Sequence, residues 1–192
     1  MKKITFLTLL GLISLNFSCA DEVTYTEDNQ EFLDELSGIY TLTKIDFETA
    51  VDLDADGDLG SNLFEEYISC EWSIPLGDYQ AKFHVNINIE NKSVVLEVPF
   101  SHYDGLSDQQ TSCMRPSRID RQIEIDYGSK TISLASNAYE EDFFYSTFQT
   151  KVIDVVWDNR IIYATIEKEF FTPNEEWETV ILEVEYEWQT PE

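Results

Sequence analysis

Four aspartates alternate along the segment "DLDADGDLG", an arrangement that places oxygen ligands around a hard cation: Asp52, Asp54, Asp56 and Asp58. In the calcium-loop pattern, ligands occupy positions 1, 3, 5 and 7, and glycine occupies position 6. Counted from Asp52, the segment matches these positions, with Gly57 as the glycine. The twelfth position is Leu63 instead of a bidentate glutamate, although Glu65 and Glu66 follow closely.

Two interpretations of this acidic loop, residues 52–58, stay open. Clustered carboxylates repel each other, by roughly 3 kcal/mol for a pair about 5 Å apart at an effective dielectric of 20, and a Ca²⁺ ion would relieve that repulsion. The alternative is a solvated turn, in which aspartate side chains accept hydrogen bonds from backbone amides and Gly57 adopts a positive φ. Because no helix pair flanks the loop, a bound Ca²⁺ is expected to have a structural role and not a sensing one.

Groups for acid–base or nucleophilic catalysis are scarce. Of the two histidines, His84 alternates onto the polar side of its segment, whereas His102 continues an apolar side and is a candidate ligand-binding residue at the mouth of a barrel. No G-x-S-x-G, H-E-x-x-H or phosphate-binding glycine motif is present. With 38 acidic residues in the chain, a pair of carboxylates has no specificity as a glycosidase signal. We therefore predict that the protein is not an enzyme.

Three further residues are candidates for ligand binding. Arg121 falls between Ile119 and Ile123 on an apolar side, where an inward guanidinium would receive a carboxylate ligand. The alternative is an arginine that pairs with a buried acid or extends along the strand to solvent. Tyr145 and Trp157 belong to an aromatic-rich region that either lines a pocket for an apolar or sugar ligand or packs as ordinary core.

The chain begins with two lysines and an apolar run from Ile4 to Leu15, which is too short to remain as a membrane-spanning helix. A small residue, Ser18, then precedes Cys19. This start resembles a bacterial lipoprotein signal, in which the cysteine is lipidated and becomes the mature N-terminus; the alternative is an ordinary cleaved signal. Asp21 and Glu22 are similar to the surface-export signal of lipoproteins in Bacteroidota-type Gram-negative bacteria. The resemblance implies a signal peptide over residues 1–18 and an outer-membrane anchor, with the cell surface as the final location.

Cysteine usage fits an exported protein. If Cys19 carries lipid, Cys70 and Cys113 remain as one pair in an oxidising compartment. Closing a loop of roughly 40 residues stabilises a fold by about 4 kcal/mol in the chain-entropy model. The alternative is two buried free thiols, and neither cysteine has the C-x-x-C spacing of a zinc site.

Charge and composition exclude some partners. The formal net charge is −26, and it becomes −28 when residues 1–18 are removed with two of the 12 basic residues. A nucleic acid needs a basic face, so we exclude it as a partner and expect membrane contact through acyl chains only. Because 43% of the residues are hydrophobic, the chain can bury a sizeable core. We predict a flexible tether over residues 19–31 and one domain over residues 32–192, monomeric in solution.

A period of two runs through most of the predicted domain. It is clearest near the C-terminus, where one side of a segment carries Val180, Leu182, Val184, Tyr186 and Trp188. The turn sequences "YGSK", "WDNR" and "FTPNEEW" separate such segments. We therefore predict an all-β fold, an antiparallel up-and-down barrel of about eight to ten strands, after a short helical turn in the stretch "EFLDELSG" that ends at Gly38. Residues 101–118 lack periodicity and are predicted to form a loop beside the acidic loop.

The stretch "LSGIYTLTKID" places Gly38 two residues before Tyr40 at the start of the first predicted strand. It resembles the opening of a lipocalin-like domain, with Tyr where Trp is usual. The stretch "VDLDADGDLGSNLFEEYISC" is similar to one in lipocalin-like lipoproteins of the same bacteria, in which an acidic loop precedes a short helix and a cysteine. The resemblance implies a lipocalin-like barrel that binds a ligand, without naming the ligand.

Together these expectations describe a lipid-anchored, lipocalin-like binding protein for a small apolar ligand or a partner protein. The alternative, from another class, is a structural or accessory lipoprotein of an outer-membrane assembly that has no ligand pocket. An apolar cavity of a few hundred Å³ at the barrel mouth would favour the small ligand. A barrel filled by side chains and bearing an exposed apolar patch would favour the partner protein.

Overall fold

The computed structural model describes residues 27–85, 92–104, 109–136 and 138–189. The predicted signal peptide, Cys19 and the predicted tether up to residue 26 lie outside these ranges. Within them, no helix combines the length and the apolar character needed to cross a membrane.

Strands dominate the described chain, which confirms the predicted all-β class. In chain order the elements are α1 (Glu27–Leu36), β1 (Tyr40–Val51), β2 (Gly60–Asn62), α2 (Leu63–Glu66), the 3₁₀ turn η1 (Leu76–Asp78), β3 (Gln80–Val85), β4 (Lys92–Asp104), β5 (Gln109–Asp126), β6 (Thr131–Leu134), α3 (Ala138–Phe148), β7 (Thr150–Asp158), β8 (Ile161–Phe171) and β9 (Trp177–Trp188).

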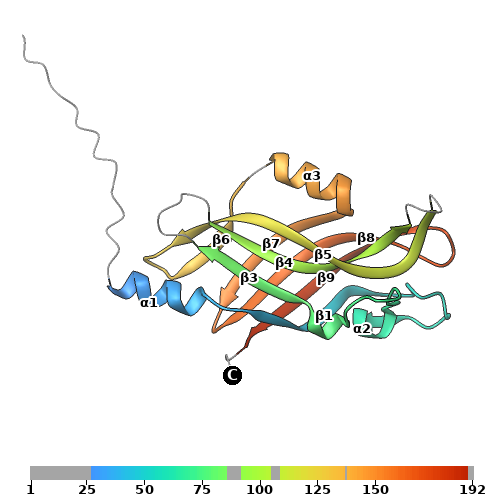
Figure 1. The fold of residues 1–192 in the computed structure, drawn as a ribbon, viewed down its shortest axis with the longest axis horizontal. Coiled ribbons are helices and arrows are strands. Elements are labelled where there is room, and N and C mark those ends of the chain that lie inside the picture. Colours follow the sequence, from blue (N-terminus) through green and yellow to red (C-terminus); the bar gives the residue numbers. More distant parts are fainter. Residues whose placement is uncertain (1–26, 86–91, 105–108, 137, 190–192) are drawn as a thin grey trace, which may run out of the picture.

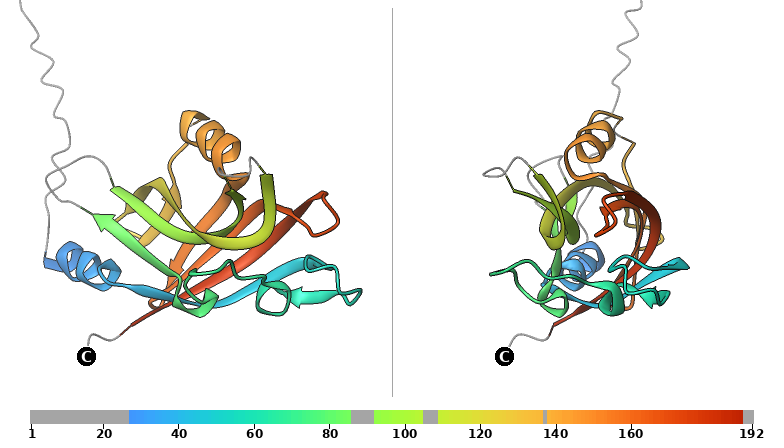
Figure 2. Two further views of the ribbon diagram at one scale, coloured as in Figure 1. Left: turned by 45° about the vertical axis from the view of Figure 1, so that its right-hand side comes forward. Right: turned by 90° about the vertical axis from the view of Figure 1, so that its right-hand side faces the viewer.

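Eight of the strands form a nearly closed antiparallel barrel (Figures 1 and 2). The order around the barrel is β6-β5-β4-β3-β1-β9-β8-β7, and the short β2 pairs with β1. The first and last strands, β1 and β9, are hydrogen-bonded to each other, so the seam lies between β6 and β7. These two strands lie close together, but no ladder joins them in the described chain.

The predicted alternation of side chains builds the barrel wall. In β9 the residues predicted to face inward are buried from Val180 to Tyr186, and Glu183 and Glu187 between and after them are exposed. The predicted turn "WDNR" is a two-residue hairpin between β7 and β8, in which Asn159 and Arg160 have φ of 48° and 64°. Such positive φ values match the right-handed twist of the flanking strands.

The prediction of a loop over residues 101–118 is wrong. Most of this segment belongs to the long ribbon of β4 and β5, in which Pro99 lies opposite Pro116. From Gln110 to Cys113, β5 is half-buried at every residue, on both of its faces. The alternation of exposed and buried side chains is therefore missing there, although the backbone remains a strand.

Helical structure also departs from the prediction. The segment "AYEEDFFYSTF" is rich in aromatic residues, which are enriched in strands, yet it forms α3, in contact with β7 and β5 (Figure 2). α3 joins β6 to β7, where an up-and-down barrel would have a hairpin. The N-terminal helix α1 begins at Glu27, inside the predicted tether, and is longer than the short turn predicted in "EFLDELSG".

One continuous core joins the barrel to the segments that close its two ends. α1 closes the first end and buries Phe32, Leu33 and Leu36; we call it the tether end, with the turns at residues 127–130 and 159–160. The chain between β1 and β3, residues 52–79, closes the other end and buries Leu53 and Leu63 among others; we call it the disulfide end. Figure 1 places α1 and α2 at opposite ends of the molecule.

Candidate functional site

The acidic loop folds as a series of turns capped by aspartates. Asp52 accepts hydrogen bonds from the backbone amides of Asp56 (3.1 Å) and Gly57 (3.0 Å). Asp54 accepts from the Asp56 amide at 3.1 Å, and Asp56 accepts from the Asp58 amide at 2.8 Å. Gly57 has a φ of 95°, which glycine adopts without strain. The predicted capping of amides by aspartates is therefore confirmed.

Glu66, at the end of α2, adds a buried carboxylate to this loop. It is 4% exposed, and its Oε2 accepts from the amides of Leu53 (2.7 Å) and Asp54 (3.3 Å). Gly60 is required beside it, because a Cβ at that position would collide with the Glu66 carboxylate. The same interaction that folds the loop thus fixes the position of the Glu66 oxygens.

Carboxylate oxygens of Asp52, Asp54 and Glu66 lie within 4.8 Å of one another. Such an oxygen-only donor set is the type that Ca²⁺ takes. The structure brings together two of the four predicted ligands and adds Glu66, whereas Asp56 and Asp58 are not part of the cluster and are exposed.

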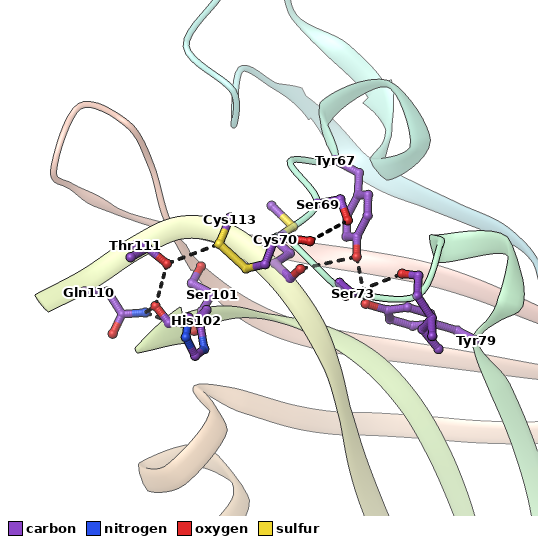
Figure 3. The surroundings of a disulfide bond; sticks show 12 residues. Tyr67, Ser69, Cys70, Ser73, Tyr79, Ser101, His102, Gln110, Thr111 and Cys113 are labelled. Atoms are coloured by element: carbon purple, nitrogen blue, oxygen red, sulfur yellow. Dashed lines mark hydrogen bonds between the residues drawn. A yellow bond between two sulfur atoms is a disulfide. The ribbon is translucent and has the colours of Figure 1, made fainter. Parts of the chain in front are cut away.

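The disulfide fastens this end of the barrel to β5 (Figure 3). Cys70 and Cys113 are bonded, with their Cα atoms 4.8 Å apart, which confirms the predicted pair. Beside the bond, the amide of Met114 donates to the carbonyl of Ile68 (2.6 Å), and the amide of Cys70 donates to the carbonyl of Met114 (3.1 Å). β1 and β5 are not neighbours in the sheet. The chain after the acidic loop therefore reaches a different part of the barrel wall and is held there covalently.

Two tyrosines pack next to this connection. The hydroxyls of Tyr67 and Tyr79 are 3.0 Å apart, and their rings meet edge to face (Figure 3). Tyr67 also donates to the Met114 carbonyl at 3.4 Å. Burial, with the nearby Tyr67 hydroxyl, raises the pKa of Tyr79 far above its usual value, so the hydroxyl stays neutral. The pair acts as a hydrogen-bonded support for the disulfide end.

Large apolar side chains are exposed at the same end. Trp72 is 93% exposed, and its backbone has a left-handed φ of 66°, which is strained for a bulky residue. Leu59 is 71% exposed, Phe64 is 46% exposed and Ile74 is 41% exposed. We call these four residues the exposed apolar group.

Several large side chains are fully buried inside the barrel. The largest fully buried side chains include Arg121, Tyr40, Tyr186 and Phe170. Arg121 is 1% exposed and lies on β5 opposite Val94, so its predicted inward direction is confirmed. Its role in ligand binding remains a prediction.

The other predicted ligand-binding residues make contacts in different parts of the fold. His102 is half-buried on β4. Tyr145 is exposed on α3 and donates a hydrogen bond to the Glu169 carboxylate (3.0 Å). Trp157 lies at the tether end, where its Nε1 donates to the Tyr40 hydroxyl at 3.0 Å. These contacts do not bring the predicted residues into one pocket.

Sequence reasoning missed Lys168, which is 1% exposed. Its Nζ donates to the carbonyls of Phe148 (2.5 Å), Gln149 (3.3 Å) and Glu169 (3.0 Å), so it satisfies acceptors at the end of α3. Burial lowers the pKa of Lys168 to about 7. A signal was available, since Lys168 continues the inward alternation of Ile166 on β8, just as Arg121 does on its own strand.

The tether end carries open, polar clefts. One of about 560 Å³ is lined by Gln30, Glu31, Asp34, Glu35 and Arg160. A second, of about 410 Å³, shares Glu35 and Arg160 and is also lined by Trp157. Four of the five residues that line the first cleft are charged. Neither cleft has the mainly apolar lining that a small apolar ligand requires.

No protein-family model matches the chain, and no match was found among curated proteins or solved structures.

Proposed function

We propose that this protein is an exported, lipid-anchored, lipocalin-like barrel that binds a partner protein and carries out no reaction itself. The observation that carries the proposal is the exposure of four large apolar side chains at the disulfide end, with Trp72 93% exposed. Four of the eleven exposed large apolar side chains of the described residues come from this one segment, residues 59–74, and clustered apolar surface is typical of interaction sites. Tryptophan is the residue type that most often dominates the binding energy of such sites.

The predicted anchor supports a protein partner over a lipid one. Seven residues, 20–26, separate Cys19 from the first residue of α1. Such a segment spans at most about 25 Å when fully extended. An acyl chain on Cys19 would therefore hold the tether end near the membrane. The exposed apolar group, at the opposite end of the molecule in Figure 1, would then face away from the bilayer.

The small apolar ligand has less support. Buried side chains such as Arg121 and Tyr186 occupy the interior that such a ligand would need. The alternative of an accessory subunit in an outer-membrane assembly is compatible with the same exposed group, and it differs in requiring a permanent complex.

Native mass spectrometry of the acylated protein, purified in mild detergent from its own host, tests the proposal. We expect a mass added by a bound protein, which disappears with Trp72→Ala and persists with Tyr163→Ala, a control on the exposed wall of β8. A bound apolar small molecule that survives Trp72→Ala would support ligand carriage instead. A bare monomer would contradict the proposal, and a partner present at fixed stoichiometry in all preparations would favour the accessory subunit.

The same proposal includes a structural Ca²⁺ in the acidic loop, for which the convergence of Asp52, Asp54 and Glu66 is the supporting geometry. Millimolar Ca²⁺ should raise the unfolding temperature, and a chelator should reverse the change. The effect should be lost in Asp54→Asn and retained in Asp58→Asn, because Asp58 lies outside the cluster. No shift in the wild type would end the calcium hypothesis and leave the partner hypothesis intact.

A further inference from the structure

We infer that the partner presents a basic surface around an apolar pocket, and that the disulfide end docks onto it with Trp72 as the central contact. This inference rests on the proposed function, because it specifies the chemistry of the partner. It follows from the charge around the exposed apolar group, from the way Trp72 is held, and from the position of the disulfide end.

The charge of the disulfide end has one sign. Residues 45–81 contain no lysine or arginine, and they contain ten acidic residues: Asp46, Glu48, Asp52, Asp54, Asp56, Asp58, Glu65, Glu66, Glu71 and Asp78. Two of the exposed ones are sequence neighbours of the exposed apolar group, Glu65 next to Phe64 and Glu71 next to Trp72. The adjoining part of β5 adds one cation, Arg115. An apolar contact enclosed by carboxylates is complementary to an apolar pocket enclosed by cations.

Trp72 is presented by a rigid turn. The amide of Ser73 donates to the carbonyl of Cys70 at 3.1 Å, which closes a tight turn around Glu71 and Trp72. Cys70 is itself held by the disulfide and by its backbone bond to Met114. The backbone at Trp72 is therefore held in place before binding, so that presenting this residue requires little further ordering of the backbone.

Other occupants fit this surface less well. Anionic lipid and nucleic acid are repelled by the carboxylates. A second copy of the chain would bring two sets of these carboxylates together, and they would repel each other. Arg115 is the cation of adjoining β5 that could offset this repulsion. A neutral lipid surface could accommodate Trp72, but it would have no favourable interaction with the surrounding carboxylates. A basic protein face uses both features, and the disulfide end is turned toward it if Cys19 carries the anchor.

Site-specific photocrosslinking in living host cells tests the inference. A photoreactive benzoylphenylalanine is placed at position 72, with matched probes at exposed positions 163 on the barrel wall and 39 at the tether end. Far-UV circular dichroism and an intact disulfide confirm that each variant is folded. We expect position 72, and neither control, to form a discrete crosslink with one protein. Mass spectrometry should place the crosslink beside lysines or arginines of that protein.

Binding measured between this protein and the purified crosslinked partner then tests whether the contact is both apolar and electrostatic. We expect Trp72→Ala to weaken binding on the order of 30-fold. Raising NaCl from 50 to 500 mM should weaken it roughly tenfold, and Asp56→Asn with Asp58→Asn should reduce that salt dependence. Binding that is independent of salt would overturn the inference that the partner presents a basic surface.

The remaining outcomes separate this inference from the function on which it rests. Crosslinks from position 39 or 163 but not 72 would overturn the docking surface and leave partner binding intact. No crosslink from any position would count against the proposed function itself. Flotation of the protein with neutral phosphatidylcholine vesicles, abolished by Trp72→Ala, would show that the exposed apolar group binds lipid and would also overturn the inference.

Discussion

The two ends of the barrel are closed in different ways. At the tether end, α1 satisfies most of its own backbone hydrogen bonds and buries Phe32 and Leu36 along one side. At the disulfide end, an irregular segment needs aspartate caps, the Glu66 carboxylate and a covalent bond to β5 to hold its shape. The helix closes its end mainly by packing, with the Tyr40 hydroxyl donating to the Leu36 carbonyl (3.0 Å), whereas the irregular segment needs several polar contacts and a covalent one.

The difference also extends to what each end exposes. The lining of the tether-end clefts is mostly polar or charged, with Arg160 stacked on Trp188. The disulfide end exposes Trp72 on a strained turn. Fixed irregular structure can present a side chain that packing alone would bury, and this is why we place recognition at the disulfide end.

Removing the covalent bond should have the largest effect on this comparison. Replacing both Cys70 and Cys113 by serine frees a loop whose ends are 43 residues apart in sequence. Unfolding in urea should show a loss of about 4 kcal/mol. In hydrogen exchange, the amides of Cys70 and Met114 should lose protection well before those of α1. Equal loss at both ends would show that the disulfide stabilises the barrel as a whole.

Shortening a buried side chain of α1 should destabilise the tether end through the loss of apolar packing. Leu36→Ala removes a fully buried side chain of α1 and should cost about 3 kcal/mol in the free energy of unfolding. Asp34→Ala, on the exposed side of the same helix, should change it by less than about 0.5 kcal/mol. Thermal unfolding of both variants checks this. A comparable loss from Asp34→Ala would mean that polar contacts, and not apolar packing, hold α1.

A third junction, where α3 meets β7, depends on the buried Lys168 and should respond to pH. The folded chain releases this proton near pH 7, whereas the unfolded chain holds it to a pKa near 10.5. The unfolded chain therefore binds more protons between these values, and stability should rise with pH, by roughly 1–2 kcal/mol from pH 7 to 9. Urea unfolding of wild type and Lys168→Met isolates the effect. A wild-type pH slope no steeper than that of Lys168→Met would rule it out.

The smallest effect is expected at the residue we consider most important for binding. Trp72→Ala removes a side chain that is almost fully exposed, so the free energy of unfolding should change by less than about 0.5 kcal/mol. Trp72→Gly should be neutral or slightly stabilising, because glycine adopts the positive φ without strain. Differential scanning calorimetry measures both. A clear destabilisation by Trp72→Ala would mean that this residue supports the fold and would weaken its assignment to binding.

Much of the barrel was predictable from the alternation of buried and exposed residues, and the prediction failed where that alternation is absent. β9 was predicted residue by residue, because one face meets the core and the other meets water. Residues 110–113 of β5 were not, because both faces are half-buried there. α3 was missed because its aromatic residues resemble those of a strand, and its helical form depends on packing against β5 and β7.

The candidate site was predictable in part. The spacing of Asp52 and Asp54 around Gly57 indicated a capped or metal-binding loop, and the count of cysteines indicated the pair Cys70 and Cys113. The exposure of Trp72 had no signal in the sequence, since a tryptophan is normally taken as core.

The sequence by itself determined the strand periodicity, the acidic charge and the small number of cysteines that can form a disulfide, because these follow from local spacing and composition. Tertiary structure decided that Glu66 completes the carboxylate cluster, that Lys168 caps α3, and that Trp72 points into solvent. Each of these outcomes depends on atoms that are brought together from separate parts of the chain, and local patterns carry no record of such neighbours.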